Sequence, residues 1–82
     1  MKRPTKPAPE RVFEAVLAHP DGSADTLALV ARWNGKTWRC VSKDAPDLGY
    51  LEARSAARNA AVAIAAKRGL VLASFDGEPV RR

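Results

Sequence analysis

The sequence has a single cysteine and a single histidine in its 82 residues. Cys40 has no second cysteine for an internal disulfide, and no cluster of Cys and His residues exists to hold zinc, haem or an iron–sulfur cluster. A Ser/His/Asp triad would need His19 as its base. We therefore predict that the chain uses no cofactor or metal and is not an enzyme.

Long apolar runs are also missing. None approaches the ~18 residues of a membrane span. The first residues are basic, but Pro4, Pro7 and Pro9 follow where a secretory signal has its apolar stretch. We therefore expect a cytoplasmic protein that does not contact a membrane.

Large apolar side chains are few, because alanine supplies much of the 46% apolar fraction. A chain of this length forms one domain with one core. Each large apolar side chain therefore matters to that core.

The net charge of +5 lies wholly in the two ends of the chain. Residues 1–11 carry four basic side chains against Glu10, and Arg81 and Arg82 add two more. Between Val12 and Val80, eight basic side chains balance eight acidic ones. Basic ends favour polyanions without sequence specificity. The alternative is that they keep a neutral domain soluble.

The proline-rich residues 1–10 predict a disordered basic arm. Residues 11–19 fit a helical spacing almost as well as alternation. We assign a strand because Pro20-Asp21-Gly22-Ser23 is typical of a turn before another strand. Alternation then places Phe13, Ala15 and Leu17 on one face.

Residues 26–43 contain two strand-like runs around Asn34-Gly35, the pair that favours a two-residue hairpin turn. That turn predicts Trp33 opposite Lys36 and Leu29 opposite Cys40. The inner face is then apolar, and the outer face carries Arg32, Arg39 and Lys43.

A helix is expected to begin between Tyr50 and Ala56, with Ser55 as its N-cap, or earlier near Asp47. It ends near Arg68, followed by Gly69 as a C-terminal cap. Val62 and Ile64 are about 200° apart on this helix, so only one can point into the core.

Residues 70–75 predict the last strand, closed by Asp76-Gly77. The fold class is therefore α+β, an antiparallel sheet with one alanine-rich helix in the order β-β-β-α-β. The domain occupies residues 11–76, and residues 77–82 form a frayed basic tail.

Basic side chains occur beside tryptophans around the predicted hairpin, a combination that can bind nucleic acid. Because Trp38 is on the inner face, we interpret it as a core residue. The candidate nucleic-acid-binding residues are Lys2, Arg3, Lys6, Arg11, Arg32, Lys36, Arg39, Lys43, Arg81 and Arg82.

Four other residues carry side chains that can take part in chemistry. Arg54 and Arg58 share a helix face and can grip a phosphate or carboxylate, or form a solvated face paired with nearby acids. His19, beside a turn, is interpreted as a solvated or capping residue. Cys40, on the inner face, is interpreted as a buried thiol.

Three strands, the loop Pro46-Asp47-Leu48-Gly49 and a helix containing Asn59 and Ile64 resemble the N-terminal half of HicB-type antitoxins. The resemblance covers residues 12–75, although the loop lacks that family's second glycine. It implies a partial RNase H-like β-β-β-α-β domain that neutralises a small toxin acting on RNA. Gly69 and Asp76-Gly77 equally resemble other small bacterial families of unknown function, so no site residue is carried over.

Our leading hypothesis is a small non-enzymatic binding module that contacts nucleic acid through its basic ends. The alternative is an antitoxin-like module for protein interaction or self-association, because exposed strand edges can pair with another chain. The partner is then nucleic acid or protein, and the chain is a monomer or a weak homodimer.

Overall fold

Strands β1 (Glu10–Ala18) and β2 (Ala24–Trp33) form the centre of a five-stranded sheet with the order β3-β2-β1-β4-β5. The computed structural model describes residues 9–46 and 48–80. In β1, Phe13, Ala15 and Leu17 are buried, whereas Val12 on the opposite face is 62% exposed. This alternation confirms the strand that we predicted for residues 11–19.

The predicted two-residue turn at Asn34-Gly35 is wrong. Strand β3 (Trp38–Cys40) pairs with β2 so that Trp33 lies opposite Trp38, and four residues form the loop. Asn34 explains the longer loop, because its Oδ1 accepts hydrogen bonds from the backbone N–H groups of Lys36 and Thr37. Compared with the predicted pairing, the register is shifted by two residues. Because side chains alternate with a period of two, the same side chains stay on each face of the sheet.

Helix α1 (Ala53–Arg68) begins and ends within the predicted range. Ser55 is not its N-cap. Glu52 precedes the helix in an extended conformation and makes no side-chain capping bond. At the other end, Gly69 adopts a left-handed φ of 69°, and its N–H donates to the carbonyl groups of Ala65 and Ala66. This is the C-terminal cap that the sequence predicted.

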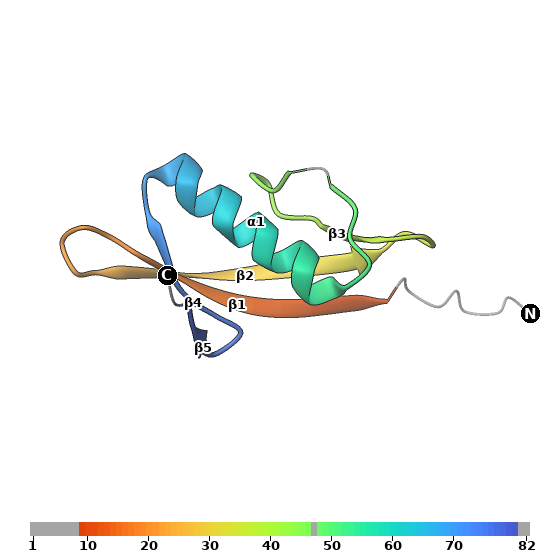
Figure 1. The fold of residues 1–82 in the computed structure, drawn as a ribbon, viewed down its shortest axis with the longest axis horizontal. Helices are drawn as coiled ribbons and strands as arrows, with labels where there is room; N and C mark the ends of the chain where they lie inside the picture. The colour runs from red at the N-terminus through yellow and green to blue at the C-terminus, as the bar shows by residue number, and fades with distance from the viewer. Residues whose placement is uncertain (1–8, 47, 81–82) are drawn as a thin grey trace, which may run out of the picture.

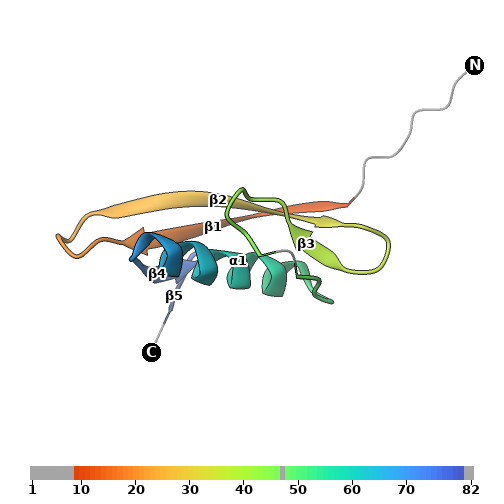
Figure 2. The ribbon, with the colours of Figure 1, turned by 90° about the horizontal axis from the view of Figure 1, so that it is seen from above.

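Helix α1 lies against one face of β1 and β2, and no described helix lies on the opposite face (Figures 1 and 2). Its contact side consists mainly of alanine, so the helix axis can come close to the sheet. Ile64 is buried and Val62 is 51% exposed, as the predicted 200° separation requires. The buried residues of the helix are Ala53, Ala56, Ala57, Ala60, Ala61, Ile64 and Ala65.

Strand β4 (Val71–Phe75) pairs antiparallel with β1 and contributes Phe75 to the core. The ring of Phe75 stacks on Phe13 with centroids 5.6 Å apart. The predicted fraying after residue 76 is wrong for β5 (Glu78–Pro79), which pairs with β4. The Val80 N–H also donates to the Ala73 carbonyl, so the fold continues to the last described residue.

The predicted α+β class is therefore confirmed, with β5 as a short addition at one edge. The predicted arm ends earlier than expected, because Glu10 belongs to β1 and the Pro9 carbonyl accepts from the Trp33 N–H. Residues 1–8 of that arm, Asp47 and residues 81–82 lie outside the described residues.

Candidate functional site

Half of the predicted nucleic-acid-binding residues can be placed on the fold. Arg32 and Arg39 lie opposite each other in β2 and β3, and both are exposed on the outer face. Arg11 is exposed at the start of β1, and Lys36 is exposed in the hairpin loop. Outside the described residues lie Lys2, Arg3, Lys6, Arg81 and Arg82.

The predicted platform of Arg32, Arg39 and Lys43 is not formed. Lys43 lies beyond the end of β3, beside Ile64 and Arg68 of α1. Arg32 is held by Glu10, whose Oε2 accepts from its Nε at 3.0 Å and from its Nη2 at 2.8 Å. The cationic groups are therefore divided between separate surfaces.

Arg54 belongs to a solvated face, one of the two alternatives for the Arg54/Arg58 pair. It donates to Asp76 of the β4–β5 turn at 2.8 Å and to Glu78 of β5 at 3.2 Å, so these two acids satisfy its guanidinium. Arg58 has no ion pair with another described residue. Both arginines line a cavity of about 260 Å³ next to Phe75 and Pro79.

His19 directly follows β1 and Cys40 is the last residue of β3, and the two have different partners. His19 Nε2 is 2.7 Å from Asp25 Oδ2 near the turn between β1 and β2, and both side chains are partly exposed. Cys40 is half-buried, and its thiol donates to Ser42 Oγ at 3.4 Å. Within the described part of the chain, no three or more His, Cys, Asp and Glu residues are grouped closely enough to hold a metal ion.

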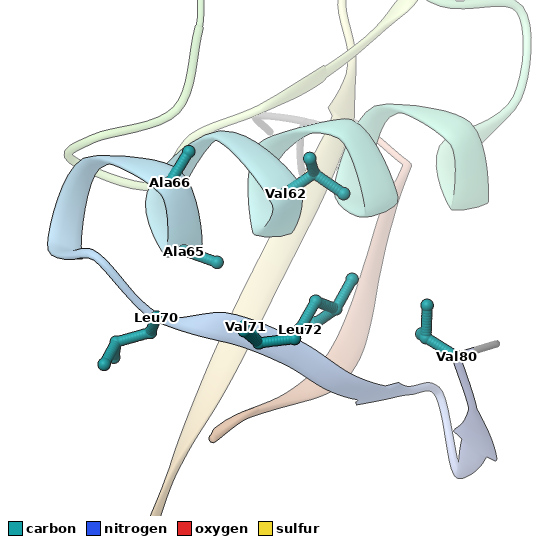
Figure 3. A pocket seen from close by; sticks show the side chains of 7 residues that line it. All are labelled: Val62, Ala65, Ala66, Leu70, Val71, Leu72 and Val80. Atoms are coloured by element: carbon teal, nitrogen blue, oxygen red, sulfur yellow. The ribbon is translucent and has the colours of Figure 1, made fainter. Parts of the chain in front are cut away.

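A cavity of about 280 Å³ opens between the C-terminal half of α1 and strand β4 (Figure 3). Every side chain that lines it is apolar, so it can accept an apolar group but supplies no acid or base. Among the large side chains of this lining, Val62 and Val71 are the most exposed, at 51% and 43%. Its lining consists of Val62, Ala65, Ala66, Leu70, Val71, Leu72 and Val80.

The edge of β2 provides a different kind of site. β2 is paired with β1 along its whole length, but its pairing with β3 covers only Ala31–Trp33. One more hydrogen bond, from the Val41 N–H to the Val30 carbonyl, closes that ladder. Residues 24–29 therefore have no strand partner on this side within the described residues. Figure 1 shows β2 continuing past β3 towards the turn at His19–Ser23.

Alternation along β2 determines which backbone groups face the open side. Val30 and Asn34 bond toward β3, whereas the Trp33 N–H donates to Pro9 on the β1 side. The N–H and C=O groups of even-numbered residues therefore point away from β1. Along the unpaired stretch, these groups belong to Ala24, Thr26 and Ala28, all three of which are exposed. We call these three residues the open edge.

Positive charge collects beside one end of the open edge. A small cavity of about 80 Å³ lies between β2, α1 and the segment after β3, with Leu27 and Leu29 among its lining residues and Lys43 and Arg68 beside them. Asp44 also lines it, but three cationic groups surround this single carboxylate. Lys67 donates to Asp44 Oδ1 at 3.0 Å.

The surrounding positive groups lower the pKa of Asp44. The hydrogen bond from Lys67 lowers the pKa of this carboxyl below its ordinary value of 3.8, and the charges of Lys67, Arg68 and Lys43 lower it further. Asp44 is therefore ionised at neutral pH, and the cavity rim keeps a net positive charge.

Negative charge collects at the opposite end of the open edge, near the turn that joins β1 to β2. Asp21 Oδ1 accepts from the N–H and hydroxyl of Ser23, and these bonds lower the pKa of Asp21. Asp25 lies in β2 itself, opposite Leu17. Because Leu17 is buried under α1, Asp25 is on the helix side of the sheet.

The sequence reasoning missed the open edge because it assumed two strands of similar length around Asn34-Gly35. A signal was present: the second run ends in Ser42-Lys43 and is followed by Asp44-Ala45-Pro46, a stretch poor in strand-forming residues. The Ala45 N–H donates to the Ser42 carbonyl, so the chain turns there.

Comparisons with family models, with curated proteins and with solved structures give no match for this chain. Within the described residues, no helix combines the length and the apolar character needed to cross a membrane.

Proposed function

We propose that this chain is a non-enzymatic protein-binding module that pairs, through the open edge of β2, with an extended segment of another polypeptide. The observation that carries the proposal is the row of backbone groups without a strand partner at the exposed residues Ala24, Thr26 and Ala28. An unpaired edge of this kind is a template for an added strand.

Natural edges are protected by a proline, a bulge or a charged side chain. Asp25 is the one charged residue of this stretch, and it lies on the helix side with its carboxylate 2.7 Å from His19 Nε2. Residues 24–29 contain no proline or lysine. Their pairing with β1 is regular, without a bulge. The exposed edge is therefore suited to binding, and the small cavity beside Leu27, which Lys43 and Arg68 also line, can receive a side chain of the added strand.

A pair of variants at Thr26 tests the proposal. Thr26→Pro removes an N–H that points away from β1, so it blocks an added strand without breaking the β1–β2 ladder. Thr26→Ala keeps the N–H and is the matched control. Immobilised wild type and Thr26→Ala should retain a protein, either this chain or another, that Thr26→Pro does not retain. Equal retention by all three forms, or retention of nothing, overturns the proposal.

Nucleic-acid binding through the basic ends is the second candidate, because the whole net charge of +5 belongs to residues 1–11 and 81–82. It predicts binding of labelled DNA and RNA that weakens steeply with salt. A chain with both ends neutralised by Lys→Gln and Arg→Gln substitutions should lose most of that salt dependence. An absence of binding even at low salt would refute it.

A further inference from the structure

We infer that the partner of the open edge is a second copy of this chain, so that two β2 strands pair antiparallel about a two-fold axis at Thr26. This inference depends on the proposed function and adds the identity of the partner. It rests on two observations: the hydrogen-bonding groups that remain available, and the distribution of charge along the edge.

The available backbone groups determine the register. The Val30 carbonyl already accepts from Val41, so the ladder with a second copy cannot extend to residue 30. Three outward-facing residues remain, centred on Thr26. In an antiparallel pair, Thr26 then lies opposite Thr26 of the second copy, and Ala24 lies opposite Ala28 in both directions. Each such pair exchanges two hydrogen bonds.

The charge distribution fits this arrangement. Pairing about Thr26 places Asp25 of the second copy opposite Leu27, on the helix side of the sheet. Leu27 lines the small cavity that also has Lys43 and Arg68 in its lining. The carboxylate of each copy therefore approaches the positive rim of the other, and the two-fold axis makes the contact twice. Opposite charges placed across neighbouring strands stabilise the pairing.

The expected dimer is weak and depends on concentration. Pairing of short edges buries a small area, at the low end of specific protein interfaces. Sedimentation velocity of the full chain over a range of concentrations should show monomers that convert to dimers. In Thr26→Pro the association constant should fall by more than about tenfold, because the central pair loses its hydrogen bonds. Thr26→Ala should associate like the wild type.

Charge-swapped variants test the register and do not depend on a proline. Asp25→Lys alone and Lys43→Glu alone each place like charges together twice, so each should associate about tenfold more weakly. An equimolar mixture of the two should recover association, because each interface then contains two opposite-charge contacts. A thermal melt of each variant confirms that it is folded.

The outcomes separate the inference from the proposed function. A wild type that stays monomeric at every concentration overturns the inference. So does a dimer that Thr26→Pro leaves unchanged, or a charge-swapped mixture that associates no better than its components. If purified protein is monomeric but still retains a different protein through Thr26, the proposed function stands and only the identity of the partner is wrong.

Discussion

Arg54 lies over the ring of Phe75, with its guanidinium carbon 5.2 Å from the ring centroid. The same guanidinium donates to Asp76, which is in the turn between β4 and β5, and to Glu78, which begins β5. One side chain of α1 therefore anchors the C-terminal hairpin. Arg58, one helical turn later, makes no ion pair with a described residue, although it lines the same cavity.

Replacing Arg54 by Ala should lower the free energy of unfolding by about 1 kcal/mol. Partly exposed ion pairs contribute at most about 1 kcal/mol, and an exposed cation–π contact contributes about 0.5–1 kcal/mol. The melting temperature should fall by roughly 4–8 °C per kcal/mol in a domain of this size. Arg58→Ala is the matched control and should melt within 2 °C or so of the wild type. Equal losses in both variants would contradict this role of Arg54.

The close approach of α1 to the sheet predicts that a larger side chain at Ala57 is harmful. Ala57 is completely buried, so Ala57→Leu must displace the helix or the strand beneath it. Chemical denaturation should show a free energy of unfolding lower by about 1–3 kcal/mol. Ala66→Leu adds the same atoms to the same helix at an exposed position. Ala66→Leu should change the free energy of unfolding little. A decrease as large as that of Ala57→Leu would argue against close packing of α1 on the sheet.

Because the backbone at Gly69 is left-handed, a side chain at this position should destabilise the fold through its backbone conformation and not through a steric clash with neighbours. A Cβ atom added at Gly69 meets nothing within 4 Å, but φ is +69°. Gly69→Ala should therefore destabilise the chain by about 1–2 kcal/mol. Gly69→Asn should cost less, because asparagine tolerates this conformation better. Alanine and asparagine variants of equal stability would contradict the argument.

The sequence predicted those parts of the fold that depend on local signals. Alternation in β1 identified its buried face, and Gly69 marked the end of α1. The hairpin register was missed because Asn34 has two uses: it favours a two-residue turn with Gly35, but its side chain can instead accept from the N–H groups of Lys36 and Thr37. Strand β5 was missed because its pairing with β4 involves only two residues.

The candidate site was less predictable than the fold. Lys43 was expected on the outer face, because the strand was assumed to continue through residue 43. Once β3 ends at Cys40, Lys43 is placed by the following loop, and its neighbours Ile64 and Arg68 come from a helix about twenty residues away in the chain. The open edge likewise exists because β3 is much shorter than β2. The relative length of two strands is not encoded in either segment alone.

The hydrogen bond between Lys67 and Asp44 predicts a specific dependence on pH. The pKa of Asp44 is below 3.8 in the folded chain, so the native state favours the carboxylate relative to the unfolded state. The stabilising contribution is therefore fully present above pH 3.8 and is lost as the pH falls through the folded pKa. Lys67→Gln should raise the pKa of Asp44 toward 3.8, which an NMR titration of the carboxyl carbon measures.

Stability measurements provide a second check on the same pair. Lys67→Gln should unfold more easily than the wild type at pH 7, and the difference should shrink as the pH falls through the folded pKa of Asp44, because protonation removes the charge that Lys67 contacts. Arg58→Gln is the matched control, since it removes a helix charge that makes no ion pair with a described residue. It should leave the titration of Asp44 almost unchanged. An Asp44 pKa that is the same in wild type and Lys67→Gln would show that Lys67 does not hold this carboxylate.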